Sequence, residues 1–219
     1  MASFADPKLL VFLPALIGVF LVPLRRPDWA WLATIALLLS LGVELLGRSL
    51  ASSGTPNLVF YNAYMVMEFL LITAMLWSMD VGRQHGGIRS VIMLLLFLAT
   101  LAFELWHQSP VSTFFTKSVV VGGLVMAMGS ILVLFRLAND GQEALHRRAE
   151  FWMLLSVVTY FLGFIPILGL YFYIAERDPE LGASIYRIND VLFVLRYALF
   201  TASMIVLFLE LRPHRHGFR

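Results

Sequence analysis

Apolar positions fall into seven blocks along the chain, and short polar segments separate them. The blocks cover residues 9–24, 29–46, 57–79, 88–106, 114–137, 151–175 and 188–211. Because about 20 apolar residues suffice for a helix to cross a bilayer, each block predicts a transmembrane helix. The first block is the shortest, and we expect Pro14 and Pro23 to kink it. The pattern predicts an all-α, polytopic membrane protein, a bundle of seven transmembrane helices that forms a single domain over residues 1–219.

The composition agrees with this class of protein. The chain is 60% hydrophobic and 14% charged, whereas soluble domains are about half apolar and about a quarter charged. It contains no cysteine, which excludes disulfides, iron–sulfur clusters and thiolate chemistry. The first block lacks a basic leading segment and a small-residue cleavage site, so we expect it to be retained as a helix.

Lysine and arginine residues are distributed unevenly between the two sides of the predicted bundle. The loops after the first, third and fifth blocks, together with the C-terminal tail, hold ten of them, and the opposite side holds five. Because cytoplasmic loops are enriched in these residues, the N-terminus is predicted outside and the C-terminus in the cytoplasm. These charges lie beside apolar spans, where basic residues set the topology and contact the lipid bilayer. They therefore do not indicate nucleic-acid binding. The cytoplasmic loop with Arg147 and Arg148 is either a topology anchor or a docking surface for a partner.

The block at residues 57–79 carries an acidic residue at its middle. Asn57, Tyr61, Tyr64 and Glu68 are spaced four, three and four apart, so they form one stripe on a helix. Lipid cannot solvate such a stripe, which therefore has to face protein or water. The rest of the bundle must supply what it faces.

Glu68 and Arg196 are expected at similar depths. Glu68 lies about 15 Å and Arg196 about 12 Å from the outer ends of their helices, at 1.5 Å per residue. Asn189, Arg196 and Ser203 repeat at seven and give the last block its own polar stripe. Two interpretations remain open: a structural salt bridge between the third and seventh helices, or a solvated or ligand-filled cavity with this pair at its floor. Glu44 is expected near the outer interface, and the inner half of the bundle is expected to be almost purely apolar.

A Glu-x-x-His pattern, Glu104 to His107, has the ligand spacing of di-iron carboxylate bundles. With Glu44 and Glu68 it would provide three carboxylates and one imidazole for a metal. Only one such motif is present, so the favoured interpretation is that Glu104 and His107 cap and pair at the interface. Arg196 cannot form a Schiff base, and no catalytic motif or cofactor loop is visible. We therefore predict no cofactor, and a non-enzymatic role is favoured over an enzymatic one.

Four segments resemble a group of small, uncharacterised seven-helix bacterial inner-membrane proteins. They read LLLSLGVELLG, NLVFYNAYMVMEFLL, EFWMLLSVVTYFLGF and IYRINDVLFVLRYALF. The resemblance implies a location in the bacterial cytoplasmic membrane and brings no known activity. The group shares an acid late in helix two, an Asn/Tyr/Glu face on helix three, a Phe-Trp opening and a Tyr on helix six, and an Asn early in helix seven. These positions are Glu44; Asn57, Tyr64 and Glu68; Phe151, Trp152 and Tyr160; and Asn189.

The leading functional hypothesis is a non-enzymatic membrane module. It would be a sensor-like or accessory subunit with an outward-opening polar cavity and a basic cytoplasmic face for a protein partner. The first alternative is a small-solute or proton-coupled transporter that uses Glu68. The second is an intramembrane metal-dependent enzyme built on Glu44, Glu68, Glu104 and His107.

Overall fold

The computed structural model describes residues 10–21, 26–80, 86–109, 113–140, 144–175 and 177–211. All regular structure within these ranges is helical. In chain order, the elements are α1 (Phe12–Leu16), the π-helical turn η2 (Ile17–Leu21), α2 (Asp28–Ser52), α3 (Leu58–Asp80), α4 (Gly86–His107), α5 (Thr116–Asn139), the 3₁₀ turn η3 (Leu145–Arg147), α6 (Ala149–Ala175), α7 (Pro179–Tyr186) and α8 (Ile188–Leu211).

Six of the described helices are long and apolar enough to cross a membrane: α2, α3, α4, α5, α6 and α8. Each begins and ends within two residues of a predicted block, except that α2 continues six residues beyond its block, and α8 has the predicted bounds. Their large hydrophobic side chains are extensively exposed, among them Leu95, Met128 and Val191. Soluble monomers rarely expose so much apolar surface, whereas the lipid-facing surface of a helical membrane protein is apolar. This surface is therefore the one that contacts lipid. The fold is therefore an all-helical, multi-pass membrane bundle.

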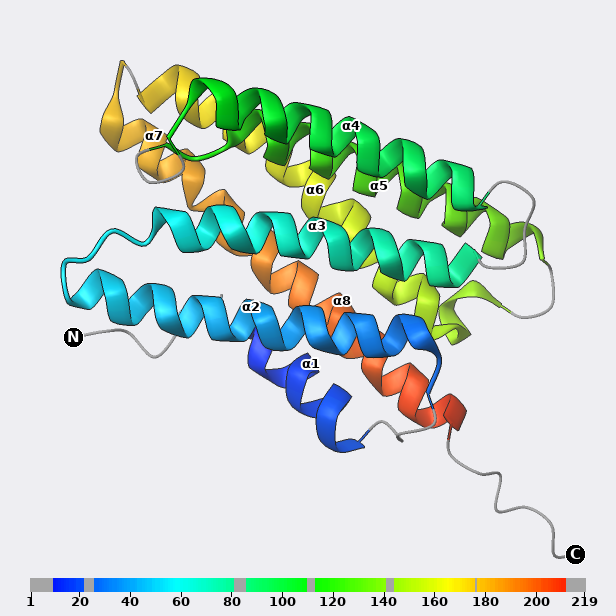
Figure 1. The fold of residues 1–219 in the computed structure, drawn as a ribbon. Helices are drawn as coiled ribbons and strands as arrows, with labels where there is room; N and C mark the ends of the chain where they lie inside the picture. Colours follow the sequence, from blue (N-terminus) through cyan, green and yellow to red (C-terminus); the bar gives the residue numbers. More distant parts are fainter. Residues whose placement is uncertain are drawn as a thin grey trace, which may run out of the picture.

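The first predicted block contains only a short helical segment among the described residues, Phe12–Leu21. Ten residues rise about 15 Å, half the thickness of the hydrocarbon layer. The segment packs against α2 and α8, and Figure 1 places α1 near the end of the bundle where α2 begins and α8 finishes. The rest of the block, residues 9 and 22–24, lies outside the described residues, so the count of seven spans stays a prediction.

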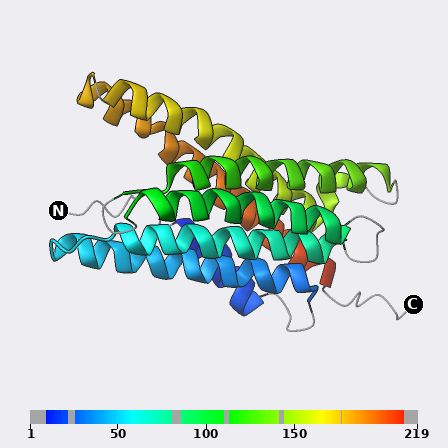
Figure 2. The same ribbon diagram turned by 45° about the horizontal axis from the view of Figure 1, so that its top comes forward.

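Consecutive long helices run antiparallel, as Figure 1 shows. α2 packs on α3, α3 on α4, and α4 on α5, while α6 packs on α5 and α8. α7 was not predicted; it lies in the expected external loop and marks what we call the α7 end of the bundle. At this end the tips of α6 and α8, with α7, diverge from α2–α5 (Figure 2). We call α2–α5 and α6–α8 the two helix groups of the bundle.

Two adjacent glycines on α5 bring four helices together. A Cβ atom on Gly122 would lie 3.0 Å from the ring of Phe97 on α4, and one on Gly123 would lie 2.9 Å from the ring of Phe161 on α6. The rings of Phe69 and Phe97 stack beside this site with centroids 3.8 Å apart. The missing side chains therefore allow the close packing of α5 on α3, α4 and α6.

The end of the bundle opposite α7 holds a buried ion pair, which corrects the expectation that this half is almost purely apolar. Arg136 on α5 donates a hydrogen bond to Asp80, the buried last residue of α3. Arg89 on α4 lies 3.7 Å from the other carboxylate oxygen of Asp80. Asp80 is at the end of a helix, close to the interface. At such a position, the pattern of apolar residues does not determine whether a charged side chain points into the bundle or into water. This pair ties α3, α4 and α5 together.

Candidate functional site

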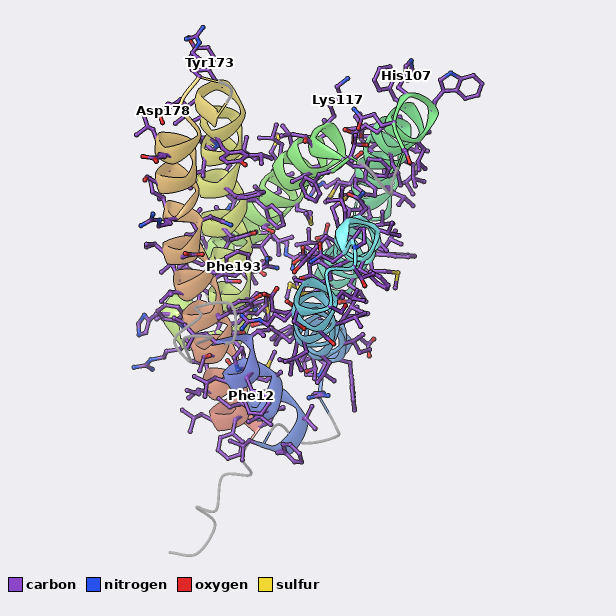
Figure 3. The ribbon with its side chains drawn as sticks, turned by 90° about the vertical axis from the view of Figure 1, so that its left-hand side faces the viewer. Phe12, His107, Lys117, Tyr173, Asp178 and Phe193 are labelled. Carbon is purple, nitrogen blue, oxygen red and sulfur yellow. The ribbon has the colours of Figure 1, made fainter. Side chains whose placement is uncertain are left out.

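A cavity of about 520 Å³ lies between the two helix groups. It extends along α6 from Tyr160 to Tyr171, about 16 Å of helix, and reaches residues in the first turns of α3 and α8 at the α7 end. Figure 3 views the bundle from this end: His107 and Lys117 lie on one side, Tyr173 and Asp178 lie on the other, and Phe193 lies lower between the helix groups. We call this space the central cavity. Its size is typical of a small-molecule site.

The floor of the central cavity is an ion pair between α3 and α8. Nη2 of Arg196 donates to Oε1 of Glu68, and the hydroxyl of Tyr64 donates to the same oxygen over 3.0 Å. Arg196 is buried and only 12% of the Glu68 side chain is exposed, so both charges are largely removed from solvent. The predicted pairing of these two residues is present.

Aromatic rings surround the guanidinium group of Arg196. Its central carbon lies 4.4 Å from the ring centroid of Tyr160 and between 5.6 and 5.9 Å from the rings of Phe161, Phe200 and Tyr197. A ring face carries partial negative charge and attracts a cation at these distances. Glu68 and this aromatic group together compensate the buried positive charge.

Helix α2 provides the polar wall opposite α8. Ser40 and Tyr197 share a hydrogen bond of 3.0 Å between α2 and α8. Glu44 also lines the cavity, and its Oε1 lies 3.5 Å from Nε of Arg48, one turn along the same helix. A Cβ atom on Gly47 would lie 2.5 Å from the hydroxyl of Tyr61, so the glycine lets this tyrosine pack directly on the backbone of α2.

Seven of the nine predicted site residues line the central cavity. They are Glu44, Tyr61, Tyr64, Glu68, Tyr160, Asn189 and Arg196. Asn57 is not among the lining residues; its amide donates to the carbonyl oxygen of Gly47 over 3.2 Å and thereby joins the ends of α2 and α3.

Glu104 does not line the central cavity, and its carboxylate binds backbone N–H groups instead. Its two carboxylate oxygens accept hydrogen bonds from the backbone N–H groups of Lys117 and Ser118, at 2.9 and 2.8 Å. These N–H groups belong to the first turn of α5, where no intrahelical acceptor is available and where negative charge is favoured. Buried Glu104 is therefore the cap of α5, supplied from α4.

His107 does not join Glu104 in a donor set. Its Nδ1 donates to the carbonyl oxygen of Phe103, 2.8 Å away, and its exposed ring packs on the ring of Phe103. Within the described ranges, no three His, Asp or Glu side chains are gathered closely enough to hold a metal ion. With both oxygens of Glu104 engaged by backbone, the arrangement does not fit the metal site considered from the sequence.

Comparison of the chain with protein-family models, with curated protein sequences and with solved structures finds no match. The geometry of the central cavity is therefore the main evidence for the function of this protein.

Several polar contacts around the cavity were not predicted from the sequence. Asn62 adjoins the predicted stripe but points elsewhere: its side chain donates to the carbonyl oxygen of Thr113 and accepts from the N–H group of Phe115, at 2.9 and 3.2 Å. Asn62 thus fixes the segment before α5. Ser40 and Tyr197 were also missed, although a spacing of four from Ser40 to Glu44 could have placed Ser40 on the same face of α2.

Proposed function

We propose that this protein is a non-enzymatic ligand-binding module of the membrane, acting as a sensor-like or accessory subunit. The observation that carries the proposal is the central cavity itself, with the Glu68–Arg196 pair at its floor. A pair that served only as a clamp between helices would need no cavity above it. The arrangement instead offers a bound molecule both apolar and polar contacts.

A protein partner on the cytoplasmic side is the second part of the proposal. His146 and Arg147 are exposed in η3, at the end of the bundle opposite α7. The indole N–H of Trp152 donates to the carbonyl oxygen of His146 over 2.8 Å and holds this turn against α6. An ordered, exposed basic turn suits an acidic surface on a partner. The proposed partner is tested by purifying the wild-type protein and the Arg147→Glu variant and comparing the proteins that co-purify. The variant should lose partners that wild type retains.

Ligand binding is tested by occupancy of the cavity. The protein is purified in lipid nanodiscs, and small molecules that remain bound are detected by native mass spectrometry. The control variant is Val119→Trp, because Val119 lines the cavity and a tryptophan there would occupy part of the space that a ligand needs. We expect wild type to retain a small molecule that the folded control lacks. Equal occupancy of the two proteins by every detected species would contradict the proposal.

A proton-coupled transporter is the alternative that one observation favours. Glu68 carries the hydrogen bonds of Arg196 and Tyr64 on one oxygen. Protonation of Glu68 would release the guanidinium group, which is the kind of event that couples a proton to a conformational change. Proteoliposomes loaded with a pH-sensitive dye test this alternative. It requires proton flux that Glu68→Gln abolishes, and the absence of flux under every imposed gradient removes it.

For the topology we propose seven spans in a bacterial cytoplasmic membrane, with the N-terminus outside and the C-terminus in the cytoplasm. The chain has no cysteine, so single cysteines can be introduced without background. In intact cells, a membrane-impermeant maleimide should label a cysteine at exposed Ser53 and spare one at exposed Arg147. If the maleimide labelled the cysteine at position 147 and not the one at position 53, the protein would have the opposite orientation.

A further inference from the structure

The walls of the central cavity differ in character. The side formed by α4 and α5 is almost entirely apolar and includes Phe97, Val119 and Met126. The side formed by α2 and α3 carries the carboxylates of Glu44 and Glu68. A molecule that fills the cavity therefore needs an apolar body and one polar end.

The charges along the cavity favour a positive polar end. Arg196 is the one cationic residue among the described lining residues, and its charge is already matched by Glu68. An anionic ligand would thus find two carboxylates and no uncommitted cation. Burial of an unmatched negative charge beside them is costly.

Glu44 is the carboxylate that remains available to a ligand. Its one described ion pair is with Arg48, at 3.5 Å, and a third of the Arg48 side chain is exposed. No hydrogen bond to Glu44 is present among the described residues, in contrast to Glu68, which holds Arg196 and Tyr64. A ligand ammonium group could replace the weak pairing with Arg48.

The aromatic lining suits the same charge. Eleven of the 25 lining residues are Phe or Tyr. Arg196 shows that these rings stabilise a buried cation, because its guanidinium group lies 4.4 Å from the ring centroid of Tyr160. Aromatic rings beside a carboxylate are the combination that recognises organic ammonium groups.

We propose that the ligand of the central cavity is a lipophilic amine in its protonated form, with its ammonium group at Glu44 and its apolar body against α4 and α5. This inference rests on the proposed ligand-binding function and names the chemical class of the ligand.

Three probes with the same chain test the charge: decylammonium, decanol and decanoate. Binding is measured by calorimetric titration of the protein in nanodiscs of zwitterionic lipid, and the signal of Val119→Trp in identical nanodiscs is subtracted to remove partition into lipid. We expect decylammonium to bind at least about tenfold more tightly than decanol, with decanoate weakest.

Two matched variants locate the ammonium group. Glu44→Gln should weaken decylammonium binding by about tenfold or more and leave decanol unchanged, because the variant removes a charge and keeps the shape. Arg48→Gln should bind decylammonium as tightly as wild type or more tightly, since it removes a competing cation. Both sites are only partly buried, so both variants should fold, and circular dichroism checks this.

The outcomes separate the two proposals. If decanoate binds most tightly, if the three probes bind equally, or if Glu44→Gln leaves decylammonium unchanged, the amine inference is overturned and ligand binding stands. If no probe binds wild type beyond the level of Val119→Trp, the inference and the ligand-binding function both fall.

Discussion

Removal of one partner of the Glu68–Arg196 pair should cost far more stability than removal of both. Glu68→Gln keeps the side-chain shape and an acceptor for Tyr64 but leaves the guanidinium group of Arg196 buried without a counter-charge. Loss of one partner of a buried pair costs about 3–5 kcal/mol. The ring of Tyr160 retains about 1 kcal/mol of cation–π attraction. We therefore expect a loss of about 3 kcal/mol in the free energy of unfolding.

The other single variant and the double variant complete the cycle. Arg196→Met should cost less, about 2 kcal/mol, because an isolated carboxylate can take up a proton whereas guanidinium cannot. The double variant Glu68→Gln/Arg196→Met contains no buried charge, and we expect it within about 1 kcal/mol of wild type. The coupling energy is then about 4 kcal/mol or more, above the range of about 0.5–3 kcal/mol in which most measured pairwise values fall.

Unfolding by a titration of sodium dodecyl sulfate into detergent-solubilised protein, followed by circular dichroism, measures these energies. The pair Glu44–Arg48 is the control, because it joins the same residue types over 3.5 Å at a partly exposed position. Its coupling should be about 0.5 kcal/mol. A coupling for Glu68–Arg196 no larger than the control would refute the reasoning. A stable double variant that no longer binds the cavity ligand would show that the pair serves binding rather than assembly.

Three further predictions concern contacts away from the cavity floor. Glu104→Ala should lower stability by about 2 kcal/mol and accelerate amide hydrogen exchange in the first turn of α5, since two N–H groups lose their acceptor; unchanged exchange there would disprove the capping role. Asp80→Asn should cost about 2 kcal/mol, and a second change, Arg136→Gln, should recover part of it in the same unfolding assay; additive losses would argue against the pairing. Gly123→Val should cost about 1–3 kcal/mol, because its Cβ atom meets the ring of Phe161, and thermal unfolding at the wild-type temperature would contradict that close contact.

Sequence pattern predicted the membrane helices and the pairing at the cavity floor. Apolar length alone places six helices, because each must span the same hydrocarbon thickness. Glu68 and Arg196 could be paired because an isolated charge at that depth is so unfavourable that it requires a partner, and each was the other's nearest candidate in depth.

The role of each polar residue near a helix end could not be predicted in the same way. Glu104 caps α5 and Asp80 binds Arg136, and both contacts depend on the direction in which a side chain leaves its helix. Near the interface, water can solvate a polar side chain, which then needs no partner within the protein. The depth of such a residue therefore does not predict which residue it contacts. Asn62 shows that the same is true within a helix. It lies beside the polar stripe of α3 in the sequence, but its side chain binds the segment before α5 and not the cavity.

The ion pair at the cavity floor also limits the effect that the membrane potential can have on the floor. A charge that crosses the membrane gains or loses about 2.3 kcal/mol per 100 mV, and one held halfway experiences about half of that. Because Glu68 and Arg196 sum to zero charge at nearly the same depth, the voltage exerts no net force on the floor, however strongly the cell energises its membrane. An ammonium ligand that enters from the α7 end would then be the charge that the voltage acts on, and its occupancy would follow the potential.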